Sequence, residues 1–324
     1  MKRDSRIFQQ VVQAIQQANR ILIVSDGKPD GDSVGSSSAV WNWLQREGKD
    51  ATLFCPKEIQ SVFRFIDGYA HFAQDHSILE QGFDLVLVFD ASDLEHGGND
   101  VLLAKLKKPY TLINIDHHST NLGYGDINLV YTDACSTCEV VYDFFEANHI
   151  HIDHRMATSL LTGLCTDTSN FSNAGTNVRR MEAASALCAA GARHSDILRH
   201  LVQNKTVPAL RLWGLALERL HFRPEYDLAI TYFLASDIAE VPGGDEAVAG
   251  VSNFLNATCG NCDTILVLRE EDGLVKGSLR SVNRDISKFA KLLGGGGHKK
   301  ASGFAVPGRI EIQDERIRIM PVRA

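Results

Sequence analysis

The stretch Tyr110–His118 reads YTLINIDHH and indicates how the chain folds around it. Its first six residues are mostly apolar and branched, which predicts a buried β-strand. Open parallel sheets carry functional side chains beyond the carboxyl ends of their strands. A carboxylate and a neutral imidazole are also ligands that a divalent metal ion accepts at neutral pH. Asp116, His117 and His118 are therefore candidate site residues, and a polar turn that caps a helix is the alternative.

Strands and helices alternate through the first half of the chain. Apolar runs predict the strands, and amphipathic stretches predict helices, the second of which would stop at Gly48. The predicted strands are residues 20–25, 51–55, 84–89 and 111–115, and the predicted helices are residues 5–19 and 34–46. This alternation predicts a doubly wound parallel sheet with helices on both faces.

The second half begins with a mostly helical region and then changes to strands. The predicted helices are residues 137–148, 155–165, 178–190 and 195–219, and Pro208 is expected to break the last one. The predicted strands are residues 228–233, 264–269 and 274–280, followed by a helix at 286–293 and a tail that is an edge strand or loose. We therefore predict an N-terminal α/β domain over 1–190, a helical linker over 191–223 and a smaller C-terminal α/β domain over 224–324.

The composition is that of a globular protein without a strong preference for polyanions. The chain has 324 residues, of which 44% are hydrophobic and 23% charged, enough for two domains. No stretch approaches the roughly 18 apolar residues of a membrane span, and the first residues lack the apolar core of a signal peptide. We expect a cytoplasmic protein with no membrane partner. The net charge of −7 argues against long nucleic acid as a ligand, but not against a short nucleotide.

Two of the cysteine pairs have CxxC spacing, namely Cys135/Cys138 and Cys259/Cys262. A four-cysteine zinc site is one reading, although the pairs lie far apart in the sequence. The first pair favours a helix start, with Ser136 as the N-cap and a glutamate three residues later. A redox role for the second pair is open, but no thioredoxin-like βαβ pattern surrounds it.

Further aspartates follow other apolar segments. Asp30 and Asp32 lie in a PDGD sequence after the first strand, Asp90 follows the third strand, and Asp167 follows a helical segment. A simple PDG turn explains only the first two. Carboxylates that converge with His117 at one crevice would repel one another unless cations were present. A carboxylate that bridges two ions about 4 Å apart is typical of a two-metal hydrolase. The two ions activate a shared water to hydroxide and bind the phosphoryl oxygens. Mixed oxygen and nitrogen ligands favour Mn²⁺, with Mg²⁺ as the second candidate.

These segments, in this order, resemble the DHH phosphoesterase superfamily with its DHHA1 partner domain. The resemblance runs from about residue 5 to about residue 307, and it is strongest to oligoribonucleases (nanoRNases), pAp phosphatases and cyclic dinucleotide phosphodiesterases. The motifs that carry it are PDGD with GSS following, the strand-end Asp90, DHH, TDT with the downstream Phe171, LRS at 279–281 and GGGGHKKASGF. It implies that residues 1–190 form the DHH metal-binding catalytic domain and residues 224–324 the DHHA1 substrate-binding domain.

The resemblance also implies a ligand set for two metal ions. One ion would be held by Asp26, Asp30 and Asp90, and the other by Asp32, Asp90, His117 and Asp167. Asp116 would orient the imidazole of His117, as metal-bound imidazoles usually require. His118 would lie beside the scissile phosphate as a charge stabiliser or proton donor.

The chain departs from the family pattern H-x-x-P-D-x-D at its first position, where it has Asp26. A carboxylate can still ligate Mn²⁺, and it makes the site harder and more negative. An all-oxygen site that prefers Mg²⁺ or binds metal more weakly is one alternative. The other alternative is that Asp26 does not ligate at all.

By the same resemblance, the second domain supplies a phosphate grip. The glycines allow backbone N–H groups to approach an anion closely, and a guanidinium can fork onto a phosphate. The expected substrate-binding residues are Arg280, Ser281, Gly295, Gly296, Gly297 and His298. A flexible loop is the alternative for the glycines, which lack the GK[ST] ending of a Walker A motif. We interpret Lys299 and Lys300 as solvated. His149, His151 and His154 are interpreted as surface residues, with a second metal site as the alternative.

We therefore expect a cytoplasmic Mn²⁺-dependent phosphodiesterase or phosphatase with two metal ions. The expected substrates are short oligoribonucleotides and linear dinucleotides of the pApA type, with pAp and c-di-AMP as further candidates. A weakly catalytic nucleotide sensor is the alternative that rests on Asp26, and an inorganic pyrophosphatase-like activity is another. The sequence leaves the choice of metal and a homodimer open.

Overall fold

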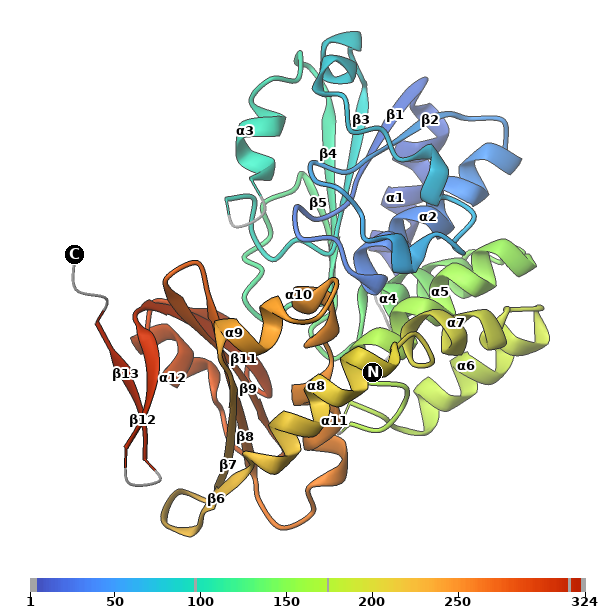
Figure 1. Cartoon of the computed structure of the whole chain (residues 1–324). Coiled ribbons are helices and arrows are strands. Elements are labelled where there is room, and N and C mark those ends of the chain that lie inside the picture. Colours follow the sequence, from blue (N-terminus) through green and yellow to red (C-terminus); the bar gives the residue numbers. More distant parts are fainter. Residues whose placement is uncertain (1–4, 96–97, 174, 314–315, 322–324) are drawn as a thin grey trace. The chain divides into compact units, whose positions relative to one another are not determined.

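The computed structural model describes residues 5–95, 98–173, 175–313 and 316–321. The chain divides into two compact units, Met1–Gln203 and Asn204–Ala324, and each combines helices with one main sheet (Figure 1). The predicted fold class is therefore confirmed. The functional limits at residues 190 and 223 stay a prediction, because compactness alone does not define a catalytic domain or a linker.

The N-terminal unit is built on a five-stranded parallel sheet with the order β2-β1-β3-β4-β5. The strands are β1 (Arg20–Val24), β2 (Asp50–Phe54), β3 (Leu85–Phe89), β4 (Thr111–Asp116) and β5 (Ile127–Val130). The four predicted strands are confirmed to within one residue at each end, whereas the short β5 was not predicted. The chain adds β2 on one side of β1 and β3 on the other, so the ends of β1 and β3 flank the switch point where such sheets bind ligands.

Alternate residues of the central strands pack into two separate apolar layers. Ile21 and Ile23 of β1 contact the layer that includes helices α1, α2, α4 and α5, whereas Leu22 and Val24 contact the layer that includes α3. Figure 1 shows α3 on one side of the sheet and α1 and α2 on the other. The helices are α1 (Ser5–Gln17), α2 (Gly31–Arg46), α3 (Asn99–Leu103), α4 (Thr137–Ala147), α5 (His154–Asp167), α6 (Val178–Ala189) and α7 (His194–Leu201), and the 3₁₀ turns are η1 (Ser61–Phe63), η2 (Tyr69–His71) and η3 (His76–Gln81).

The long helix predicted at 195–219 is broken, as the proline indicated. Its two pieces are α7 and α8 (Val207–Glu218). The hydroxyl of Thr206 accepts a hydrogen bond from the Ala209 backbone N–H, and Pro208 lies in the first turn of α8. Proline fits there because the first N–H groups of a helix have no partner within the helix.

The C-terminal unit contains a six-stranded mixed sheet with the order β10-β11-β9-β8-β7-β6, in which only β7 and β8 pair in parallel. The strands are β6 (His221–Arg223), β7 (Leu228–Phe233), β8 (Thr264–Glu271), β9 (Leu274–Ser281), β10 (Gly296–His298) and β11 (Ala301–Pro307). The remaining elements are η4 (Pro224–Tyr226), α9 (Ala235–Ala239), α10 (Gly244–Ala247), α11 (Val251–Thr258) and α12 (Ser287–Leu292).

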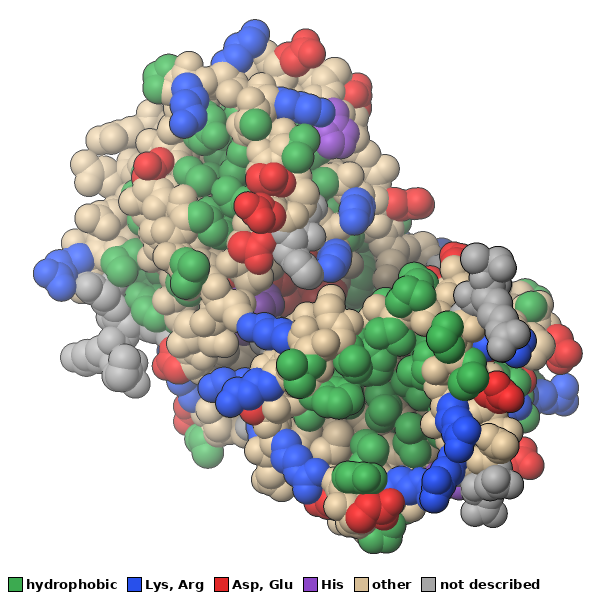
Figure 2. Space-filling model, turned by 90° about the vertical axis from the view of Figure 1, so that its left-hand side faces the viewer, with side chains coloured by type: hydrophobic (Ala, Val, Ile, Leu, Met, Phe, Trp, Pro, Cys, Tyr) green, Lys and Arg blue, Asp and Glu red, His purple; other side chains and the backbone are tan. Residues whose placement is uncertain are grey.

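The tail forms a two-stranded hairpin of β12 (Arg309–Gln313) and β13 (Arg316–Met320). Isoleucines pair across the hairpin on one face, because Ile310 lies opposite Ile319 and Ile312 opposite Ile317. Figure 2 views the side on which α12, β12 and β13 lie in Figure 1, and hydrophobic side chains gather on this face of the unit. Within the described part of the chain, every helix is too short or too polar to cross a membrane.

Candidate metal centre

Asp90 follows β3 directly and has a positive φ of 60°. Its side chain is buried, and its Oδ1 lies 3.7 Å from His117 Nε2 and 3.7 Å from His118 Nδ1. Aspartate tolerates the left-handed region better than most residues, but the conformation still costs about 1–3 kcal/mol. The backbone N–H of Asp90 donates to the Ile115 carbonyl, so the neighbouring strand holds this residue at the end of the sheet.

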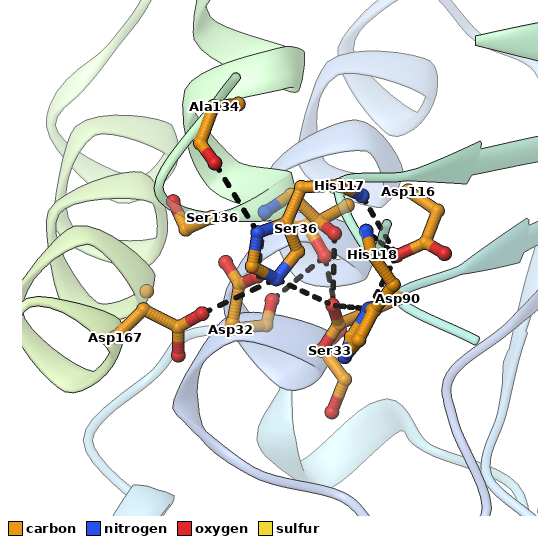
Figure 3. A network of polar contacts seen from close by, with 12 residues as sticks. Asp32, Ser33, Ser36, Asp90, Asp116, His117, His118, Ala134, Ser136 and Asp167 are labelled. Atoms are coloured by element: carbon orange, nitrogen blue, oxygen red, sulfur yellow. Dashed lines mark hydrogen bonds and ion pairs between the residues drawn. The ribbon is translucent and has the colours of Figure 1, made fainter. Parts of the chain in front are cut away.

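The imidazole of His117 faces three carboxylates. Its Nε2 lies 3.3 Å from Asp167 Oδ2, 3.7 Å from Asp90 Oδ1 and 3.8 Å from Asp32 Oδ2 (Figure 3). Its Nδ1 lies 3.4 Å from the Ala134 carbonyl oxygen, which can only accept, so we assign the proton to Nδ1. Burial and the neighbouring His118 lower the pKa of His117 to about 4, so its ring is neutral at neutral pH.

The Nε2 lone pair therefore points at three acidic groups. Burial raises the pKa of Asp32, and burial together with mutual repulsion raises the pKa values of Asp90 and Asp167 well above the usual range. A lone pair surrounded by carboxylate oxygens is repulsive unless a proton or a metal cation lies among them. The donor set of one imidazole nitrogen and carboxylate oxygens thus fits a divalent metal ion.

The N-terminus of α2 places Asp32 at this centre. The Oδ1 of Asp30 accepts hydrogen bonds from the backbone N–H groups of Asp32 (2.9 Å) and Ser33 (3.0 Å), and the Ser33 hydroxyl accepts from the Asp30 N–H (3.0 Å). This capping box starts the helix at Gly31, three residues before the predicted start at Val34. Asp32 therefore lies in the first turn of α2, and Asp30 is its N-cap.

The N-terminus of α4 holds the carboxylates of two candidate ligands. The backbone N–H of Thr137 donates to Asp32 Oδ2 (2.6 Å), and that of Cys138 donates to Asp32 Oδ1 (2.9 Å). The Thr137 hydroxyl donates to Asp90 Oδ1 (2.9 Å). Free N–H groups at a helix start stabilise anions. The predicted helix start with Ser136 as N-cap is confirmed, since its hydroxyl accepts from the N–H of the third helical residue.

Asp116 holds the ring of His118, not that of His117. The Oδ1 of Asp116 lies 2.7 Å from His118 Nδ1, and its Oδ2 accepts from Asn121 Nδ2 (2.6 Å). The expectation that Asp116 orients the His117 imidazole is therefore wrong: Asp116 meets His117 at its backbone N–H (2.7 Å), while the His117 ring faces Ala134. Burial opposes ionisation of Asp116, but the hydrogen bonds and charge of His118 and the Asn121 amide keep its pKa below the usual range. The same contact raises the pKa of His118 against the opposing effect of burial.

Asp167 is the last residue of α5, which runs two residues beyond the predicted end. The next turn is left-handed, with φ values of 50°, 56° and 62° at Ser169, Asn170 and Phe171. The Thr168 hydroxyl accepts the Phe171 N–H at 2.9 Å and stabilises this turn. Three consecutive left-handed residues are energetically unfavourable. The surrounding structure must therefore stabilise this turn, which directly follows Asp167.

The C-terminal unit carries a half-buried arginine. Arg280 Nε donates to Asn253 Oδ1 (2.6 Å), and the residue lines a cavity of about 200 Å³ together with Ser252, Arg269 and Ser278. Burial lowers the pKa of Arg280.

The next residue in β9, Ser281, lies on the opposite face of the sheet, since side chains alternate along a strand. Its hydroxyl donates to Asp263 Oδ2 (2.7 Å) and accepts from the Arg284 N–H (2.9 Å). The structure therefore does not bring Ser281 to the face that carries Arg280.

The glycine-rich segment forms the edge strand β10, which pairs with β11. A Cβ at Gly295 would lie 2.0 Å from the Gly303 carbonyl oxygen, and Gly297 has a φ of 126°, so both positions need glycine. Gly296 has open space around its Cα. The backbone of His298 belongs to β10, whereas its side chain lies outside the described residues.

Two family descriptions match the chain. Residues 20–164 match the DHH family, N-terminal domain, and residues 237–318 match the DHHA1 domain. The chain is a DHH–DHHA1 protein. Bifunctional oligoribonuclease and PAP phosphatase NrnA of Thermus thermophilus is 28% identical to it over 304 residues, 94% of this chain and 88% of the relative. NrnA of Bacillus subtilis is 24% identical and covers 92% of each chain.

Two further similarities concern a longer relative and a solved structure. Cyclic-di-AMP phosphodiesterase PdeA of Listeria monocytogenes is 24% identical and matches 91% of this DHH–DHHA1 protein, but only 46% of its own length. The crystal structure of an exopolyphosphatase-related protein from Bacteroides fragilis superimposes with a TM-score of 0.84, at 23% identity, over 94% of this chain and 92% of that one. The latter similarity establishes the fold.

The structure of this DHH–DHHA1 protein gathers some of the expected metal ligands and leaves others apart. Among the described residues, the groups whose ligand atoms lie within 4.8 Å of one another are Asp32–His117–Asp167 and Asp90–His117–His118. Neither group includes Asp26 or Asp30. The Asp26 carboxylate accepts a hydrogen bond from the Lys28 N–H (3.1 Å), and burial followed by repulsion from Asp30 raises the pKa of Asp26.

Other sequence candidates do not form metal sites in the described parts of the chain. Neither CxxC pair belongs to a group of three or more ligands there, although Cys259 Sγ and Cys262 Sγ lie 2.9 Å apart. His149, His151 and His154 are exposed beside a groove of the DHH unit, and they too form no such group within those residues.

Three functional contacts were not foreseen from the sequence. Thr137 binds two of the carboxylates, the Ala134 carbonyl meets the His117 ring, and Asn121 holds Asp116. The helix start at Ser136 was a usable signal for the first, because a capped N-terminus presents free N–H groups. The other two depend on loop paths that local sequence does not define.

Proposed function

We propose that this chain is a metal-dependent phosphohydrolase that cleaves short oligoribonucleotides and linear dinucleotides of the pApA type, with pAp and c-di-AMP as further substrates. The observation that carries the proposal is the His117 Nε2 lone pair, which faces carboxylate oxygens of Asp32, Asp90 and Asp167 at 3.3–3.8 Å. Relatives named as an oligoribonuclease and PAP phosphatase and as a cyclic dinucleotide phosphodiesterase support an enzyme of this class.

The proposed metal ligands fall into two sets that share Asp90. Asp32, Asp90, His117 and Asp167 would hold one Mn²⁺ ion, with Mg²⁺ as the alternative. Asp26 and Asp30 would complete a second, weaker set with Asp90. Bound divalent ions supply a nucleophile at neutral pH and neutralise charge on the phosphoryl oxygens. Asp32 and Asp90 fit this role because both are buried and both are held by donors at the start of α4.

His118 is the proposed proton donor. Its Nδ1 is held by Asp116 at 2.7 Å, and this contact raises its pKa, so a larger fraction of the ring is protonated near neutral pH. The protonated ring stabilises negative charge on a phosphate and donates a proton to the leaving oxygen. Asp116 acts through His118 as a positioning residue, and Asn121 holds Asp116 in turn.

The DHHA1 unit would bind the far phosphate or nucleotide end. Arg280 has five N–H donors, of which one is given to Asn253 and one to the Leu279 carbonyl, so others can face a phosphate. The backbone of Gly295–Gly297 and His298 completes the proposed grip. Ser281 has the least support, because its hydroxyl is engaged with Asp263.

The test is hydrolysis by the full chain of pApA, pAp, c-di-AMP and inorganic pyrophosphate, each with Mn²⁺, Mg²⁺ or EDTA, with products separated by chromatography. We expect turnover of pApA with Mn²⁺, none with EDTA, and a loss of more than about 100-fold in His117→Ala, since even outer-shell changes cost 10–100-fold. Tight nucleotide binding without turnover would favour the sensor. Turnover of pyrophosphate alone would favour the pyrophosphatase-like alternative.

A further inference from the structure

Arg180 of α6 ties three segments of the DHH unit together. It is buried, and its Nε donates to Glu139 Oε2 in α4 at 2.9 Å. Its other guanidinium nitrogens donate to the Asp133 carbonyl at 2.6 Å and to the Gly175 carbonyl. One planar group therefore joins α4 to the loop that precedes it and to the loop that follows α5.

Glu139 is the buried carboxylate that pairs with Arg180. It is 2% exposed, and the Oε2 that accepts from Arg180 also accepts from the Cys135 N–H at 2.7 Å. Taking two charges out of water costs several kcal/mol per ion, so a buried ion pair is a poor source of stability by itself. Its chief effect here is geometric, because the pair fixes one backbone group on each side of Ala134.

The segment that the pair fixes is the one that contacts the metal centre. The Ala134 carbonyl, between Asp133 and Cys135, accepts the hydrogen bond assigned to His117 Nδ1–H and so sets which ring nitrogen faces the carboxylates. Directly beyond it, Thr137 donates to Asp32 and to Asp90. A shift of this segment would move His117, Asp32 and Asp90 together.

The hydrogen bond from Arg180 to the Gly175 carbonyl connects Arg180 with the segment that follows Asp167, the remaining proposed ligand. The Gly175 N–H donates to Asn173 Oδ1 (2.8 Å), and Asn173 Nδ2 donates to the Asp167 carbonyl (2.8 Å). Arg180 thereby joins the loop beside Asp167 to the loop beside His117.

We propose that Glu139 and Arg180 are positioning residues for the metal centre: they fix the Ala134 carbonyl and the α4 N-terminus so that His117 and the carboxylates keep metal-binding geometry. This inference rests on the proposed function, since it concerns the same centre. Neither side chain is itself offered as a metal ligand.

The test compares Arg180→Lys and Glu139→Gln with a matched control, Arg179→Lys. Arg179 is the neighbouring residue of α6 and pairs with Asp143 of α4 at 2.6 Å. Its Nε also lies 3.9 Å from Glu139 Oε1, but its side chain is 43% exposed, so lysine keeps these charge contacts, which are weak at an exposed site. Lysine keeps the positive charge at residue 180 but loses the planar guanidinium with its several N–H donors. Glutamine keeps the shape of the side chain at residue 139 but loses its negative charge.

Three kinds of measurement are made on the metal-stripped and reloaded full chain. They are the Mn²⁺ dissociation constant by calorimetry, kcat and KM for pApA, and the amide hydrogen exchange of Thr137 and Cys138. In Arg180→Lys and Glu139→Gln we expect Mn²⁺ to bind about 10-fold to 100-fold more weakly, with a lower kcat, an unchanged KM and faster exchange. Arg179→Lys should match the wild type in all three.

The outcomes separate this inference from the proposed function. A wild type that binds Mn²⁺ and cleaves pApA, with Arg180→Lys and Glu139→Gln indistinguishable from Arg179→Lys, overturns the positioning role alone. A wild type that neither binds Mn²⁺ nor turns over substrate overturns both. If both test variants are unfolded while Arg179→Lys is folded, the pair is a folding element and the positioning role is wrong.

Discussion

Removal of metal should make the DHH unit lose stability as the pH rises. Asp90 and Asp167 have pKa values raised well above 3.8 by burial first and by neighbouring carboxylates second. Between the unfolded and folded pKa values, the folded state keeps protons that the unfolded state has released. A rise in pH therefore favours unfolding, by about 1.4 kcal/mol per pH unit for each carboxyl that remains protonated.

Mn²⁺ should reverse this dependence, because ligands bind it only after they lose their protons. At a free concentration of 100 times its dissociation constant, the ion should stabilise the folded state by about 2.7 kcal/mol. For a unit of this size, that corresponds to a rise in Tm of about 5–10 °C. At one fixed Mn²⁺ concentration, the rise in Tm should be larger at about pH 8 than at about pH 5.5, since fewer protons compete for the ligands at the higher pH.

The assay is urea unfolding of EDTA-treated and Mn²⁺-loaded protein across this pH range, followed by the fluorescence of Trp41 and Trp43. A Trp213→Phe background removes the signal of the C-terminal unit. Asp90→Asn, which carries no titrating proton, should flatten the metal-free slope by about 1.4 kcal/mol per pH unit. A metal-free protein whose stability rises over this range, or an Asp90→Asn slope equal to the wild-type slope, would refute the reasoning.

Four further substitutions test three separate parts of the structure. Asn121→Ala removes the hydrogen-bond partner of Asp116 Oδ2. It should lower the free energy of unfolding in urea by about 1–3 kcal/mol and also lower kcat. An unchanged kcat would show that Asn121 has no part in the mechanism. Arg280→Lys should raise KM for pApA while Mn²⁺ affinity, measured by calorimetry, stays the same, and a change confined to kcat would contradict a binding role. Gly295→Ala should destabilise the folded state by about 1–3 kcal/mol, because its Cβ would lie 2.0 Å from a carbonyl oxygen. Gly296→Ala should leave the thermal unfolding unchanged, because its Cβ would have open space. Equal effects of the two substitutions would contradict the packing argument.

The positions of the strand ends could be predicted from local sequence. Each central strand is a short apolar run that ends in a polar residue, so the sequence predicts that Asp90 and Asp116 lie at the same edge of the sheet. Asp32 could also be placed, since the PDGD turn must precede a helix. In these cases the information lies within a few neighbouring residues.

Contacts between distant segments could not be predicted in this way. The choice of His118 as the ring that Asp116 holds depends on side-chain rotamers within one tripeptide, which periodicity does not report. Arg180 is 41 residues from Glu139, and an isolated arginine on a helix gives no sign of burial. The glycines of residues 295–297 were interpreted as an anion grip, whereas two of them are required by the close approach of β11.

The two N–H groups that α4 offers to Asp32 also bear on how the centre is assembled. They provide a fixed partial positive charge at the carboxylate, which opposes the rise that burial causes in the pKa of Asp32. Asp32 is thus already oriented before any ion arrives. A cation that binds there would find this carboxylate already in place, so we expect a chelator to strip the metal reversibly and activity to return when Mn²⁺ is added back.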